Sequence, residues 1–70
     1  MAVEIFKTDI VEENAASNIV SHLQQLFPKA NFNFDLQDCD NILRLESDYD
    51  IIQPTIAAVK ALGFYCELLV

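Results

Sequence analysis

The sequence predicts an α+β domain in which a four-stranded antiparallel sheet carries two helices on one face. Three observations predict it. Residues 31–36, "NFNFDL", alternate apolar and polar side chains, which is typical of a strand with one buried face. Two longer segments carry apolar residues at the roughly 3.6-residue spacing of amphipathic helices. Strand-like segments precede, separate and follow these helices, so the predicted element order is β-α-β-β-α-β.

The first half of the chain should hold a strand, a helix and a second strand. Residues 3–8, "VEIFKT", are rich in β-branched and aromatic residues, which favours a strand although Ile5 and Phe6 interrupt the alternation. The first helix is predicted at 12–27, and Pro28 helps to end it. Its expected apolar stripe is Ala16, Ile19, Val20, Leu23, Leu26 and Phe27. The strand at 31–36 should bury Phe32, Phe34 and Leu36.

The second half begins with a polar hairpin loop, "QDCDN", at 37–41. The strand at 42–46 should turn Leu43 and Leu45 inward. The last strand is "FYCELLV" at 64–70, with Phe64, Cys66 and Leu68 on one face.

The second helix is predicted at about 51–62, with an apolar stripe of Ile52, Ile56, Val59 and Leu62 and with Thr55 beside it. Its start has two possible forms. Asp50 and Gln53 could form a capping box, or Gln53 could cap a helix whose first residue is Pro54. Gly63 stands where a helix C-terminus favours a left-handed residue.

Two right-handed crossovers put both helices on one side of the sheet and give the strand order 4-1-3-2, a ferredoxin-like arrangement. The opposite face should meet water. Its polar residues are Asn31, Asn33, Asp35, Arg44, Glu46, Tyr65 and Glu67.

Length and composition fit one folded domain over residues 1–70. The chain is 53% hydrophobic and holds five Phe, which argues against disorder. No apolar run approaches the roughly 20 residues of a membrane-spanning helix. Strand-like sequence begins within three residues of Met1, which leaves no room for a signal peptide and gives a cytoplasmic location as the expectation.

Eleven acidic against four basic residues give a net charge of −7. This charge argues against nucleic acid or an anionic membrane as a partner, because both require positive charge. A protein with a basic surface or a cation would complement it, although solubility alone also explains an acidic surface.

The residue types of catalysis are sparse, and no enzyme is expected. No serine has a histidine and a carboxylate arranged around it, and a small sandwich offers no deep pocket. His22, the one histidine, should lie on the surface of the first helix. Cys39 on the hairpin and Cys66 in the opposite edge strand should be too far apart for a disulfide, so Cys66 is expected in the core and Cys39 as an exposed thiol.

Two segments, "NIVSHLQQLFPKANFNFDL" and "AAVKALGFYCELL", resemble the heavy-metal-associated domain of copper chaperones and metal-transporting ATPases, and the resemblance covers nearly the whole chain. It implies that Glu12 and Ala15 stand where the family has the two cysteines of its metal motif. Soft ions such as Cu(I) bind thiolates, so the family's copper chemistry should be lost. The family's buried loop methionine falls on Ile10, whereas Lys7 falls where the family prefers an apolar residue.

In this topology the loop after the first strand, the hairpin and the turn before the last strand share one end. That end should gather Asp9, Glu12, Glu13, Asp38, Cys39 and Asp40. This acidic cluster could hold a hard cation, could hold a metal in a mixed site with Cys39, or could dock a basic protein.

Three functions therefore stay open. The first is a metallochaperone-like domain without cofactor that works through protein contacts, using the acidic end or the exposed sheet face. The second is an atypical metal-binding protein that uses loop carboxylates and Cys39. The third is an ACT-like small-molecule regulatory module, although the glycine that such modules usually carry after the first strand is missing.

Overall fold

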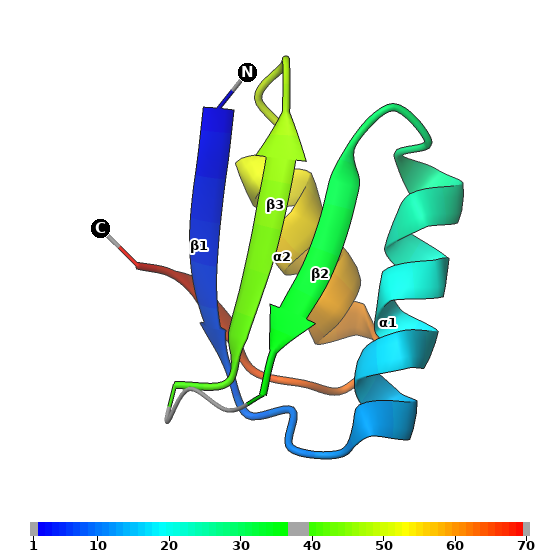
Figure 1. Ribbon diagram of the computed structural model, residues 1–70, viewed down its shortest axis with the longest axis vertical. Coiled ribbons are helices and arrows are strands. Elements are labelled where there is room, and N and C mark those ends of the chain that lie inside the picture. The colour runs from blue at the N-terminus through cyan, green and yellow to red at the C-terminus, as the bar shows by residue number, and fades with distance from the viewer. Residues whose placement is uncertain (1, 37–39, 70) are drawn as a thin grey trace.

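A computed structural model describes residues 2–36 and 40–69. Its elements are β1 (Ala2–Thr8), α1 (Glu13–Leu26), β2 (Asn31–Asp35), β3 (Ile42–Ser47), α2 (Ile52–Ala61) and β4 (Cys66–Leu68). The strands form one antiparallel sheet in the order β2-β3-β1-β4 (Figure 1). The predicted ferredoxin-like fold and its strand order are therefore confirmed. Residues 37–39 of the predicted hairpin loop lie outside the described residues.

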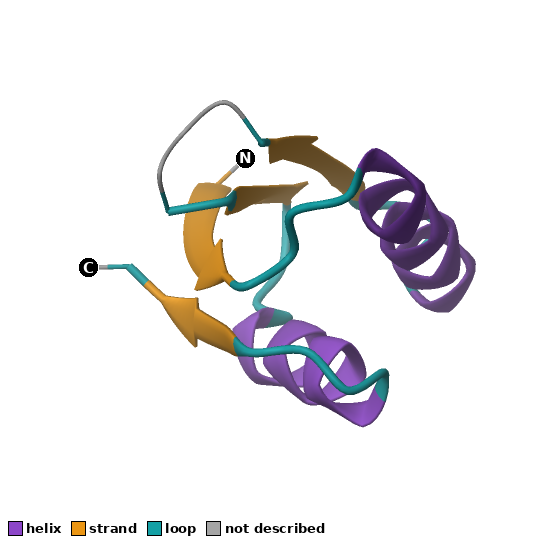
Figure 2. Cartoon of the chain, turned by 90° about the horizontal axis from the view of Figure 1, so that it is seen from below, coloured by secondary structure: helices purple, strands orange, loops and turns teal. Residues whose placement is uncertain are grey.

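The sheet and the two helices form two layers, with both helices on the same side of the sheet (Figure 2). The register fixes which side chains face the helices, because directly paired residues share a face. Phe6 of β1 pairs with Leu43 of β3 and with Leu68 of β4, and Phe34 of β2 also pairs with Leu43. The predicted inward residues of β2 and β3 are confirmed. The polar residues predicted on the opposite face are exposed, apart from the half-buried Glu46.

The described core lies between these layers. It consists of Phe6, Ile10, Ala16, Ile19, Leu23, Ala30, Phe32, Leu43, Leu45, Ile51, Val59 and Cys66. Its members come from every element and also from loops, as Ile10 shows. The expectation that Cys66 belongs to the core is confirmed.

Strand β1 places Phe6 and Thr8 inside, whereas Lys7 is exposed on the open face. The apolar residue that the family prefers at Lys7 is therefore not needed for burial here, because Phe6 supplies the core contact from the neighbouring position.

The helical stripes differ from the prediction at their C-terminal ends. Leu26 is 50% exposed because it is the last residue of α1, and the ring of Phe27 packs toward Phe32 at a centroid distance of 6.2 Å. Leu62 is 43% exposed because it lies past the end of α2. Thr55 is fully buried with Val59, so the buried side of α2 is centred closer to Thr55 than the apolar pattern predicted.

Neither predicted form of the α2 start is correct. The helix begins at Ile52, so Pro54 is its third residue, and Asp50 Oδ1 accepts a hydrogen bond from the Ile52 N–H at 3.1 Å.

At the other end of α2, the predicted role of Gly63 is confirmed by its φ of +93°. Gly63 N–H donates to Lys60 O at 2.9 Å, and Phe64 N–H donates to Val59 O at 3.4 Å. These two bonds form a Schellman motif.

Strand β4 is shorter than the predicted 64–70, although its faces alternate as expected. The Tyr65 N–H donates to Asp9 Oδ1 at 2.9 Å, so a side chain takes the hydrogen bond that strand pairing would otherwise use. Beyond β4, the Leu69 N–H donates to Ile5 O at 2.8 Å.

The outer edge of β2 is partly covered by the side chain of Gln24 in α1. Its Nε2 donates to Ala30 O at 2.8 Å, and its Oε1 accepts from the Phe32 N–H at 3.2 Å. One amide thus satisfies a backbone acceptor and a backbone donor at the start of the edge strand.

Replacing Gln24 with Ala should lower the free energy of unfolding by about 1–3 kcal/mol, because two partly buried hydrogen bonds are lost together. Urea unfolding measures the change. Gln25→Ala is the matched control, because Gln25 is the exposed neighbour in the same helix. Equal effects of the two substitutions would contradict a structural role of Gln24.

Candidate functional site

Three loops meet at one end of the sheet, which we call the loop end: residues 9–12, 40–41 and 62–65. Figure 2 views the molecule from this end. The residues between β1 and α1 lie here with the start of β3 and with the turn that follows α2 (Figure 1). The predicted meeting of these loops is confirmed for the described residues.

The hydroxyl of Thr8, at the end of β1, holds two of these loops together. The buried Thr8 Oγ1 donates to Asn41 O at 2.7 Å and accepts from the Ile10 N–H at 3.2 Å. The Thr8 N–H also donates to Asp40 O at 3.3 Å. A threonine can serve both neighbours because its hydroxyl donates and accepts at once.

This arrangement sets the direction of the loop side chains. Ile10 is fully buried, as predicted for the position of the family's loop methionine. Its neighbour Val11 is 70% exposed. Asp9 is exposed and holds the Tyr65 N–H, which ties the loop to the residue before β4. The part of the loop that directly precedes the exposed Val11 is therefore held by two hydrogen bonds, one at Asp9 and one at Ile10.

The carboxylates of Glu12 and Glu13 lie at the start of α1. Glu12 O accepts the Ala16 N–H at 3.0 Å, and Glu13 is the first helical residue. Both are exposed, and negative charge is favourable at the positive end of the helix dipole. Asp40 Oδ1 lies 3.9 Å from Lys7 Nζ, a surface pair that contributes on the order of 0–1 kcal/mol.

The predicted cluster is only partly testable, because Asp38 and Cys39 lie outside the described residues. Within the described part of the chain, no group of three or more His, Cys, Asp or Glu side chains is placed to hold a metal ion. The described members Asp9, Glu12, Glu13 and Asp40 thus form an acidic rim. A site that includes Asp38 and Cys39 stays a prediction.

The sequence reasoning missed the apolar part of the loop end. Val11, Leu62 and Tyr65 are all strongly exposed there. Val11 could have been found, because Ile10 and Val11 are adjacent in a short loop and only one of them can point into the core. Leu62 was instead assigned to the buried stripe of the second helix.

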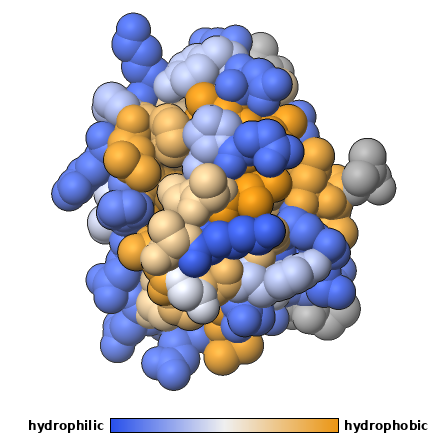
Figure 3. All heavy atoms as spheres, turned by 180° about the vertical axis from the view of Figure 1, so that it is seen from behind, coloured by the Kyte–Doolittle hydropathy of each residue, from blue (hydrophilic) through white to orange (hydrophobic). Residues whose placement is uncertain are grey.

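A shallow groove between the helices adjoins this surface. It has a volume of about 330 Å³ and is lined by Ala15, Asn18, Ile19, His22, Leu62 and Phe64. Figure 3 views this side of the molecule and shows apolar side chains in its middle, with hydrophilic ones crossing and surrounding them. His22 is exposed, as predicted.

Cys66 is buried, and burial raises the pKa of its thiol to about 11 from the ordinary 9.0, with Lys60 lowering it slightly. A thiol of this kind stays protonated at neutral pH and is a poor nucleophile or metal ligand.

On the open face, a hydrogen bond with Glu67 raises the pKa of Tyr65, and desolvation raises it further.

Comparisons of the chain with protein families, with curated proteins and with solved structures found no match. The resemblance to heavy-metal-associated domains therefore depends on the residues quoted above. Neither helix of the described residues has the length and the apolar character needed to cross a membrane.

Replacing Thr8 with Val should lower the free energy of unfolding by about 2–3 kcal/mol, because the buried Ile10 N–H and Asn41 O both lose their partner. Chemical unfolding measures the loss. Thr8→Ser is the matched control, since it keeps the hydroxyl. A valine variant as stable as the serine variant would contradict this role of Thr8.

The Cys66 thiol gives a pH prediction. Its pKa is raised in the folded state, so its contribution to stability is complete below pH of about 9 and is lost as the pH rises toward about 11. Unfolding followed across this range should show the decline. Cys66→Ala should flatten that part of the profile, apart from a smaller decline from Tyr65. Identical profiles for the two proteins would contradict the prediction.

Proposed function

We propose that this chain is a small, non-enzymatic cytoplasmic domain that acts through protein contacts. Its loop end docks a partner protein with a basic surface. The proposal takes the resemblance to heavy-metal-associated domains as a resemblance of scaffold, in which the metal ligands have been replaced by Glu12 and Ala15.

The observation that carries the proposal is the exposure of Val11 within the acidic rim. Covering a side chain that is 70% exposed removes apolar surface from water, which is favourable. The carboxylates of Asp9 and Glu12 flank it in sequence. Apolar centres with charged surroundings are the usual composition of binding sites between proteins.

The loop that carries Val11 is already fixed before a partner arrives. Thr8 holds the Ile10 N–H, and Asp9 holds the Tyr65 N–H. Binding therefore needs little ordering of this loop, and less of the interaction free energy is spent on conformational entropy.

The charge of −7 supports a basic partner rather than another acidic protein. Complementary charge would speed the encounter and suppress wrong partners, and its effect should weaken as salt is added. Nucleic acid would be repelled by the same charge.

The test uses two peptides, Lys-Lys-Leu-Leu-Lys-Lys and Lys-Lys-Ser-Ser-Lys-Lys, followed by backbone amide shifts. The leucine peptide should bind more tightly and should shift residues 9–12, 40–41 and 62–65. Val11→Ser should weaken it by about threefold to tenfold, as expected when a short peptide covers only part of the valine side chain. Val3→Ser is the matched control, because Val3 is also exposed but lies on the open sheet face.

Two results would overturn the proposal. One is equal weakening by Val3→Ser and Val11→Ser, which would show that the peptide has no preference for the loop end. The other is an equimolar response of residues 9–15 to Cu(I), Zn²⁺ or Ca²⁺ in a parallel titration, which would establish a metal site instead.

A further inference from the structure

We propose a second binding surface, on the open part of the β2 edge, which receives an extended basic segment of a partner protein as an added β-strand. The surface adjoins the loop end, because Glu13 of the acidic rim also lines it, and it consists of backbone groups of β2 and a groove between β2 and α1.

The direction of the β2 backbone groups follows from the Gln24 contact. Gln24 bonds the Phe32 N–H from outside the sheet, so the backbone groups of Phe32 point away from β3. Because orientation alternates along a strand, those of Phe34 point outward as well. Phe32 C=O and both groups of Phe34 have no hydrogen-bond partner assigned among the described residues.

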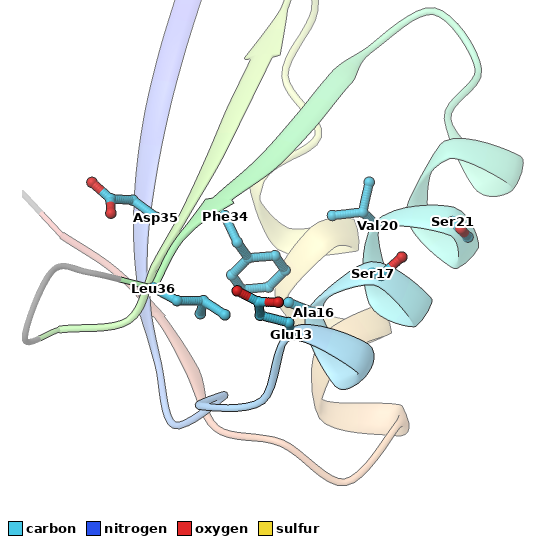
Figure 4. Close-up of a pocket in the computed structure, with 8 residues that line it drawn as sticks. All are labelled: Glu13, Ala16, Ser17, Val20, Ser21, Phe34, Asp35 and Leu36. Atoms are coloured by element: carbon cyan, nitrogen blue, oxygen red, sulfur yellow. The ribbon is translucent and has the colours of Figure 1, made fainter.

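A groove of about 500 Å³ lies beside this edge, between α1 and β2. It is lined by Glu13, Ala16, Ser17, Val20, Ser21, Phe34, Asp35 and Leu36. Figure 4 shows the Phe34 ring directed toward α1 and the Glu13 carboxylate close to Leu36, whereas Asp35 points to the other side of the strand. The groove is thus lined by apolar side chains, among them Val20 and Phe34, together with polar ones, among them Glu13 and Ser17.

These features indicate which kind of partner segment fits the edge. Outward backbone donors and acceptors pair with another extended chain, and Phe34 can exchange both of its bonds with one residue of an antiparallel strand. Alternate side chains of that strand would enter the groove between Val20 and Phe34, where apolar residues fit. Glu13 and the net charge of −7 favour Lys or Arg in the same segment.

A second copy of this chain fits less well. Pairing of two β2 edges about a twofold axis perpendicular to the sheet would place both helical layers on the same side. The two α1 helices, each beside its own β2 (Figure 1), would then lie on the same side of the joined sheet. Each copy would also bring a charge of −7.

Gln24 limits the site. Its side chain already holds Ala30 O and the Phe32 N–H, so an incoming strand can pair only from Phe32 C=O onward. The open edge is short, and a short edge protects the protein from indiscriminate strand pairing.

The test uses the peptide acetyl-Lys-Val-Lys-Val-Lys-amide with the intact chain. The Phe34 amide should shift and its hydrogen exchange should slow, while the Phe32 amide, held by Gln24, should change little. The same peptide N-methylated at every residue should bind at least tenfold more weakly, because it has lost its backbone donors.

Variants of the protein locate the contact. Glu13→Gln should weaken the peptide by about twofold to fivefold, as expected for one exposed ion pair. Glu67→Gln is the matched control, because Glu67 is equally an exposed carboxylate but lies on β4. Ser17→Trp should abolish binding by filling the groove from the exposed surface of α1.

The remaining outcomes overturn the inference. Shifts confined to residues 9–12, 40–41 and 62–65 would assign the peptide to the loop end and leave only the docking proposal. Concentration-dependent shifts of Phe34 without peptide would make a second copy the occupant. No change of the Phe34 amide at millimolar peptide would show that this edge binds no strand.

Discussion

The hydroxyl of Thr8 is the interaction on which the loop end depends. It bonds the Ile10 N–H and Asn41 O, so the strand end, the first loop and the start of β3 share one polar atom inside the molecule. Without it, the buried Ile10 N–H and the partly buried Asn41 O would both lose this partner. The Ile10 side chain is buried beside this bond, and the next residue, Val11, is exposed to solvent. The exposed valine thus directly follows a residue whose backbone is held by a buried hydrogen bond.

The two proposed surfaces use different chemistry. At the loop end, Val11 and the surrounding carboxylates offer side-chain contacts and charge. On the β2 edge, Phe34 offers backbone hydrogen bonds. The groove beside it favours incoming side chains that fit its shape. In both places a side chain binds backbone groups beside the surface. Asp9 accepts a hydrogen bond from the Tyr65 N–H in one case, and Gln24 binds Ala30 O and the Phe32 N–H in the other. A single partner with a folded basic surface and an extended tail could occupy both.

Much of the fold could be predicted because alternation and helical spacing are local properties. Phe32, Phe34, Leu43 and Leu45 face the core as their pattern requires. The failures occur where an element ends or where a distant side chain intervenes. Leu26 and Leu62 lose their place in the core because the helices stop there. The shortening of β4 depends on Asp9, which is 56 residues away from Tyr65 in sequence, so no local pattern could reveal it. The acidic rim was predictable from topology. The Gln24 contacts were not, because they join a helical side chain to backbone groups beyond the end of that helix.

Hydrogen exchange at the Ile10 amide tests the central claim most directly. Ile10 lies in a loop, and loop amides commonly exchange through small local openings. If the Thr8 hydroxyl fixes this loop, the Ile10 amide should exchange only as rarely as that of Leu45 in the central strand β3. An Ile10 amide that exchanges as fast as the exposed Val11 amide would show that the loop opens freely, and it would contradict a prebuilt docking surface.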